Sequence, residues 1–143
     1  MSLKLSTKGR YGLRAMIDLA RHHGEGPVLV RSIAERQEVS SKYLHALLAS
    51  LKAAKLVRSV RGSGGGYTLA RPDQDIHVIQ ILEALEGPIA VVDCVADAEV
   101  CNRAETCATR DLWTDLSRAF EDTLTGLTLE ELSRRQEEKE ASV

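Results

Sequence analysis

The three cysteines are the residues of this chain best suited to chemistry, because a thiolate can bind a metal ion or react with an oxidant. Cys94, Cys101 and Cys107 lie in the single run CVADAEVCNRAETC, with six residues between the first pair and five between the second. Three cysteines cannot all pair within one chain, which argues against a disulfide framework. In a reducing compartment, clustered cysteines indicate metal binding or redox chemistry instead.

The cysteine run alone leaves four interpretations open. These are an iron–sulfur cluster, a zinc site, a thiol that senses oxidation, and three chemically inert cysteines. Zinc knuckles usually contain a C-x-x-C pair, and the sequence has none. It also has no Ser/His/Asp order, no metal-hydrolase pattern and no nucleotide fingerprint, and Asp93 beside Cys94 is interpreted as a solvated loop residue. We therefore do not expect an enzyme.

The distribution of charge indicates a polyanionic partner. Residues 1–71 carry thirteen Lys or Arg and four Asp or Glu, a net charge of +9. Residues 72–143 carry six and seventeen, a net charge of −11. A basic half in a chain of this size is typical of a protein that binds nucleic acid. The alternative is a chance asymmetry of solvated side chains.

Helical periodicity predicts a helix-turn-helix ahead of the cysteines. A first helix over residues 7–22 is followed by a short helix over residues 30–37 and a third helix for which Ser40 is a suitable N-cap. The expected buried face of the third helix consists of Leu44, Leu47, Leu48 and Leu51. Two short helices joined by about three residues form a helix-turn-helix, whose second helix enters the major groove of DNA.

A β-hairpin is expected next. Residues 56–60 and 67–70 read as strands, joined by a run with four glycines that permits a tight turn and a close approach of the backbone to another surface. Such a wing would place arginine along phosphates or in the minor groove. The expected DNA-contacting residues are Lys8, Arg10, Ser40, Ser41, Lys42, Tyr43, His45, Arg58, Arg61, Gly62, Ser63 and Gly64.

The second half is predicted to be helical around the cysteine loop. A fourth helix over residues 75–86 precedes the polar run 93–107, which lacks periodicity, and a helix over 110–126 follows it. That helix has more apolar surface than one small core needs, which favours pairing of two copies; the alternative is packing on its own head. A last short helix opens at the capping box that begins with Thr128, and residues 136–143 read as a frayed charged tail.

These predictions combine into a mainly α fold with a small β-hairpin wing, a winged helix-turn-helix extended by a long C-terminal dimerisation helix. The expected units are a DNA-binding domain with its connecting helix at 1–87, a cysteine-rich loop at 88–109, and the dimerisation helix and tail at 110–143. No stretch approaches the roughly 18 apolar residues of a membrane span. Residues 1–10 contain no apolar signal-peptide core, so a cytoplasmic location is expected.

Four motifs identify a family resemblance. They are LSTKGRYGLRAM at 5–16, LVRSVRGSGGGY at 56–67, the three cysteines and LWTDL at 112–116. The chain resembles the bacterial iron–sulfur winged-helix regulators typified by IscR and NsrR, and the likeness covers nearly its whole length. The resemblance implies a dimeric repressor or activator that binds a palindromic operator in double-stranded DNA. It also implies a [2Fe–2S] or [4Fe–4S] cluster on Cys94, Cys101 and Cys107 that senses cluster supply, iron, nitric oxide or redox state.

The chain departs from this family at the fourth cluster ligand. IscR-type members have a histidine three residues after the last cysteine, where this chain has Arg110. NsrR-type members use an aspartate of the first helix in the partner subunit, where this chain has Arg10. A guanidinium that stays charged is a poor iron ligand, so we expect an exchangeable fourth site or an Asp or Glu ligand. The remaining alternative is a winged-helix regulator without a cluster, switched by cysteine oxidation or by a protein partner.

Overall fold

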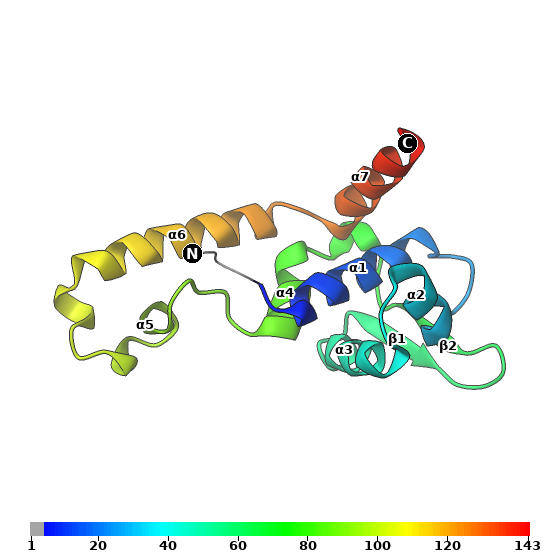
Figure 1. Ribbon diagram of the computed structural model, residues 1–143, viewed down its shortest axis with the longest axis horizontal. Coiled ribbons are helices and arrows are strands. Elements are labelled where there is room, and N and C mark those ends of the chain that lie inside the picture. Colours follow the sequence, from blue (N-terminus) through cyan, green and yellow to red (C-terminus); the bar gives the residue numbers. More distant parts are fainter. Residues whose placement is uncertain (1–4) are drawn as a thin grey trace.

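Helices account for most of the chain, and they divide between a head and a long projecting helix (Figure 1). The computed structural model describes residues 5–143. Residues 1–4, which belong to the expected DNA-binding unit and to the segment searched for a signal peptide, lie outside the described residues. In the part described, no helix is long and apolar enough to cross a membrane. The predicted mainly α fold with a β-hairpin wing is confirmed.

The first three helices form the core of the head. They are α1 (Thr7–Arg21), α2 (Val30–Gln37) and α3 (Ser41–Ala53). The Ser40 hydroxyl caps α3 as predicted, by accepting a hydrogen bond from the backbone N–H of Tyr43. Glu38 ends α2 in a left-handed conformation (φ 55°), which turns the chain toward α3. The four leucines predicted for the inner face of α3 are all buried.

The hairpin is formed by β1 (Val57–Val60) and β2 (Gly66–Leu69), which pair antiparallel with Val57 opposite Leu69 and Val60 opposite Gly66. Its outer side also pairs with the segment before α2, because Val28 and Tyr67 exchange two backbone hydrogen bonds of 2.7 and 2.8 Å. Gly66 is required at this crossing. Its φ is 147°, and a Cβ there would lie 2.3 Å from the carbonyl oxygen of Val28.

Helix α4 (Val78–Glu86) begins three residues later than the predicted residue 75. A single 3-10 turn covers Asp73–Asp75, and Ile76 is extended. The reason is a long-range backbone bridge: the N–H of Val78 donates to the carbonyl of Leu127, and the N–H of Leu129 donates to the carbonyl of Ile76. We call this the 76–129 joint. The ring of His77 adds a hydrogen bond of 2.8 Å to the carbonyl of Thr125.

The cysteine run contains short helical turns where the sequence indicated no regular structure. They are α5 (Asp93–Ala96) and the 3-10 turns η2 (Ala98–Val100) and η3 (Ala104–Thr106). Helix α6 (Ala108–Thr125) follows, and α5 packs against it at the end farthest from the head (Figure 1). We call the segment from α5 to the start of α6 the cysteine lobe.

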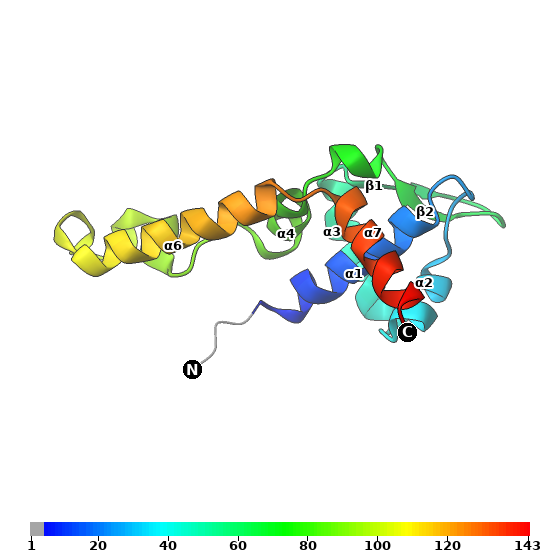
Figure 2. The ribbon, with the colours of Figure 1, turned by 90° about the horizontal axis from the view of Figure 1, so that it is seen from above.

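The prediction of a frayed C-terminal tail is wrong. Helix α7 runs from Leu129 to Ala141 and packs across α1, as Figure 2 shows. Thr128 caps it as predicted, by accepting from the N–H of Glu131. Leu129 is fully buried, and the carboxylate of Glu140 near the far end pairs with Arg21 of α1. These long-range contacts hold α7 on the head. Its sequence is too polar to indicate that it packs there.

Candidate nucleic-acid interface and cysteine lobe

The exposed face of α3 carries residues that the sequence predicts to contact DNA. Ser41, Lys42 and His45 are exposed, and Ser40 lies exposed just ahead of the helix. The opposite face is held in the core by the buried leucines. The predicted recognition helix therefore presents short polar and basic side chains outward, which suits a helix that lies in a major groove.

Tyr43 joins the recognition helix to the start of α1. Its hydroxyl lies 2.6 Å from the Thr7 hydroxyl, and its ring meets the ring of Tyr11 edge to face with centroids 6.4 Å apart. This contact places the first turns of α1, which carry the exposed Lys8 and Arg10, beside α3. The sequence predicts Tyr43 as a DNA-contacting residue, and in the structure its hydroxyl and ring position the start of α1.

Glu86 is a residue that the sequence did not single out. Its carboxylate accepts hydrogen bonds from the Gly9 backbone N–H at 2.9 Å and from the Ser6 hydroxyl. Helix α1 has no acidic residue in its own first turn. The carboxylate at the end of α4 therefore supplies the negative charge that a helix N-terminus favours, and it fixes the turn that carries Lys8 and Arg10.

The wing residues are all open to solvent. Arg58 on β1 and Arg61 at the turn are exposed, as are Gly62, Ser63 and Gly64. The turn is closed by a hydrogen bond of 3.0 Å from the N–H of Gly65 to the carbonyl of Gly62. The head thus has three basic or polar exposed regions, at the start of α1, on α3 and on the wing.

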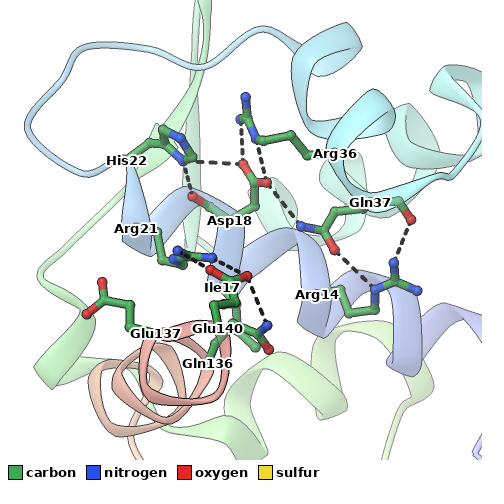
Figure 3. A pocket seen from close by; sticks show the side chains of 10 residues that line it. All are labelled: Arg14, Ile17, Asp18, Arg21, His22, Arg36, Gln37, Gln136, Glu137 and Glu140. Carbon is green, nitrogen blue, oxygen red and sulfur yellow. Dashed lines mark hydrogen bonds and ion pairs between the residues drawn. The ribbon is translucent and has the colours of Figure 1, made fainter. Parts of the chain in front are cut away.

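A network of ion pairs holds α1, α2 and α7 together (Figure 3). The buried carboxylate of Asp18 accepts two hydrogen bonds from Arg36, at 2.9 and 2.7 Å, and one from the Gln37 side chain at 3.1 Å. One helical turn further along α1, Arg21 forms a two-point ion pair with Glu140 of α7. These groups surround a polar cavity of about 710 Å³. Since Arg36 and Gln37 end α2, the network sets how the helix-turn-helix sits on α1.

The structure brings the three cysteines into the cysteine lobe. Cys94 lies on α5, Cys101 is exposed between η2 and η3, and Cys107 is the residue before α6. The hydroxyl of Thr109 lies 3.0 Å from Cys107 Sγ; this contact, followed by the backbone N–H of Arg110, lowers the pKa of the Cys107 thiol. Within residues 5–143, however, no three His, Cys, Asp or Glu side chains are gathered closely enough to hold a metal ion.

The donor set of the lobe fits three of the four ligands of an iron–sulfur cluster, because thiolates are the usual cluster ligands. Arg110 does not fit the fourth position. Its Nε instead donates a hydrogen bond of 3.0 Å to the carbonyl of Cys94. Arg10, at the other position where the resemblance would place a ligand, is exposed on α1.

A winged helix-turn-helix with an exposed recognition helix and a basic wing defines the class of DNA-binding transcriptional regulators. The family model described as Rrf2, an iron-dependent transcriptional regulator, matches residues 5–135. The chain belongs to the Rrf2 family of transcriptional regulators, and enzymatic activity is not a property of the relatives it matches.

Two solved or curated regulators illustrate the relationship. The chain is 43% identical to CymR of Bacillus subtilis over 131 residues, which is 92% of this chain and 90% of the relative. The solved structure of that protein, described as the global cysteine regulator, superposes with a TM-score of 0.78 at 42% identity and covers 94% of this chain and 98% of its own. The solved IscR of T. potens gives a TM-score of 0.80 at 44% identity, with 97% and 92% covered.

Proposed function

We propose that this regulator binds a palindromic operator as a homodimer and that an iron–sulfur cluster on Cys94, Cys101 and Cys107 controls its binding. The observation that carries the proposal is the placement of all three cysteines in one lobe at the start of α6, with the Cys107 thiol already lowered in pKa. A thiolate is the form that binds iron. The lobe consists of turns of three or four residues, short enough to shift as the thiolates converge.

The proposed DNA-contacting surface joins the three exposed regions of the head. Side chains of α3 would read base edges, the wing arginines would lie along the backbone or in the minor groove, and the start of α1 would contact phosphates. The full proposed set is Lys8, Arg10, Ser40, Ser41, Lys42, Tyr43, His45, Arg58, Arg61, Gly62, Ser63 and Gly64. Binding to DNA and the proposed use of reduced thiols both imply action in the cytoplasm.

Helix α6 is the proposed dimerisation helix, and its partner is a second copy of the chain. Leu112 and Phe120 are exposed by 55% and 44%. Ser117 is the sole residue of α6 that is buried within one chain. Exposed large apolar side chains along one helix favour burial against another protein surface. Sedimentation velocity of the wild-type chain and of Phe120→Asp tests this, because the charged variant should shift the protein toward the monomer.

The chain's own residues would carry the signal from the lobe to the head. A bound cluster supplies bonds that fix the three thiolates relative to one another. Cys107 is the N-cap residue directly before α6, and α6 ends next to the 76–129 joint on the head. A change in the arrangement of the lobe would therefore change the angle at which α6 leaves the head. In a dimer that angle sets the spacing of the two recognition helices, which must match half-sites about one helical turn apart.

Anaerobic purification followed by a visible spectrum and by iron and sulfide analysis tests the cluster. We expect a brown protein, with iron and sulfide both present. Cys101→Ala should lose both while remaining folded, whereas the neighbouring variant Asn102→Ala should retain them. A variant without cysteines that still carries stoichiometric iron would refute the site. Mössbauer spectra test the exchangeable fourth ligand, since a [2Fe–2S] centre fully ligated by protein would exclude it.

A second candidate is a regulator switched by oxidation of its cysteines, without a cluster. The exposure of Cys101 and the lowered pKa of Cys107 favour it, because exposed thiolates are the forms that peroxides attack. Regulation by a protein partner is the other form of this alternative. A colourless protein that lacks iron and sulfide after anaerobic reconstitution, and whose operator affinity changes reversibly with peroxide, would support thiol oxidation. The same protein unaffected by peroxide would point to a partner.

A further inference from the structure

Two polar side chains of α6 hold the segment that leads into the first cysteine. Arg110 donates from Nε to the carbonyl of Cys94 at 3.0 Å, and Ser117 accepts from the backbone N–H of Val91 at 3.0 Å. Ser117 is buried. Its hydroxyl is therefore committed to this contact rather than to water.

The two contacts lie on one face of α6 and at the two ends of segment 91–94. Arg110 and Ser117 are seven positions apart, which is two helical turns on one face and about 10 Å along the axis. Val92 is extended, and Asp93 and Cys94 begin α5. The three steps from Val91 to Cys94 therefore span less than about 10 Å, the length of a fully extended chain, and the Arg110 side chain reaches the carbonyl of Cys94. One helix face can therefore hold both ends of the segment without distortion of either element.

Arg110 differs in burial and in hydrogen bonding from Arg118, another arginine of α6. Arg118 lies on the same helix and is exposed, and its side chain makes no hydrogen bond or ion pair within the described range 5–143. Arg110, by contrast, is partly buried at its contact and bonds to a residue sixteen positions away.

We propose that Arg110 and Ser117 act as a clasp on segment 91–94 and that Arg110 is a positioning residue for Cys94. Cys107 lies three residues before Arg110, at the start of α6. The clasp therefore fixes the backbone of Cys94 relative to that of Cys107. The effect of the clasp on cluster binding rests on the proposed function, whereas its two hydrogen bonds are formed by the protein without a cluster. The arginine at the position of a histidine ligand would thus organise the cysteines instead of binding iron.

Alkylation of the reduced, metal-free protein tests the clasp directly. Iodoacetamide is added under anaerobic conditions, and mass spectrometry follows the rate at Cys94 relative to that at the exposed Cys101 in the same molecule. Arg110→Ala should raise this ratio about tenfold, the factor expected for losing one hydrogen bond from a charged donor. Arg110→Lys keeps a cationic donor at similar reach and should restore much of the wild-type ratio. Arg118→Ala removes the same charge from the same helix and should leave the ratio unchanged.

If the rate of alkylation at Cys94 relative to Cys101 in Arg110→Ala stays within twofold of the wild-type value, the proposal of a clasp is wrong. Circular dichroism verifies that each variant is folded. If Arg110→Ala fails to fold, Ser117→Ala takes its place: hydrogen exchange at the Val91 amide should accelerate in it, and unchanged exchange would refute the proposal.

Iron analysis of the same variants separates this inference from the proposed function. After anaerobic reconstitution, Arg110→Ala should lose iron faster than wild type and Arg118→Ala should not. A raised Cys94 ratio in a protein that never retains iron supports the clasp and rejects the cluster. Retained iron with no effect of Arg110→Ala on the ratio or on iron loss supports the cluster and rejects the clasp.

Discussion

Removal of Arg36 is expected to destabilise the head far more than removal of another arginine from α2. In Arg36→Ala the carboxylate of Asp18 stays buried, with 3% of its side chain exposed, and loses the two hydrogen bonds of 2.9 and 2.7 Å. The neutral Gln37 amide, at 3.1 Å, still donates to it, and the ring of His22 lies 3.6 Å from it. The variant therefore leaves a buried charge without its counterion, which lowers the free energy of unfolding.

The magnitude follows from the exposure of the two partners. Breaking a buried ion pair by removing one member costs about 3–5 kcal/mol. The Arg36 side chain is 39% exposed, so water can reach part of the site and reduces the cost to about 2–3 kcal/mol. At about 2–4 °C per kcal/mol for a chain of this size, the melting temperature should fall by about 4–12 °C.

Urea denaturation at neutral pH, followed by circular dichroism, measures this loss. Arg31→Ala, an exposed arginine of the same helix, should stay within about 0.5 kcal/mol of wild type. The double variant Asp18→Ala/Arg36→Ala should be less destabilised than the sum of the two single variants, because it leaves no buried charge unpaired. A cost below about 0.5 kcal/mol for Arg36→Ala would refute the reasoning that the pair fixes α2 on α1.

Three further predictions concern α7 and the wing. The Arg21 hydrogen bond lowers the pKa of Glu140, so its stabilising effect is present above the ordinary glutamate pKa and is lost as pH falls through the lowered value. Wild type should therefore be more stable than Glu140→Gln at neutral pH and should lose that advantage below about pH 4, as thermal melts across pH will measure. Leu129→Ala should cost about 2–4 kcal/mol in urea denaturation, since Leu129 is fully buried, and a cost near zero would contradict the packing of α7 on the head. Arg61→Ala should weaken operator binding and lower the slope of log affinity against log salt by about 1, whereas unchanged affinity in fluorescence anisotropy would show that the wing does not contact DNA.

Local signals in the sequence were sufficient to predict the first three helices and the wing. The bounds of α2 and the buried leucines of α3 follow from helical periodicity, and the caps at Ser40 and Thr128 follow from side-chain chemistry that acts within three residues. The glycine-rich run identified the wing, because a tight turn and a close backbone crossing both need glycine. Each of these features is decided by residues that are near one another in the chain.

Features that depend on distant residues were missed. The start of α4 is set by the joint with residues 127–129, and the order of α7 depends on Arg21, more than a hundred residues earlier. Glu86 caps α1 from the end of another helix, and no pattern within α1 indicates it. The cysteines were found from their spacing, but the contact of Arg110 with Cys94 depends on how α5 folds back against α6.

The 76–129 joint makes α6 a lever arm. The helix has 18 residues, so it extends about 27 Å from its attachment on the head to the cysteine lobe. A rotation of about 6° at the joint moves the far end by about 3 Å, on the scale of a single hydrogen bond. Conversely, a shift of about one bond length among the cysteines corresponds to a rotation of α6 by only a few degrees at the joint. Under the proposed function, a chemical change at the three sulfur atoms would therefore reach the proposed DNA-contacting surface as a small rotation at the joint, without unfolding any element between them.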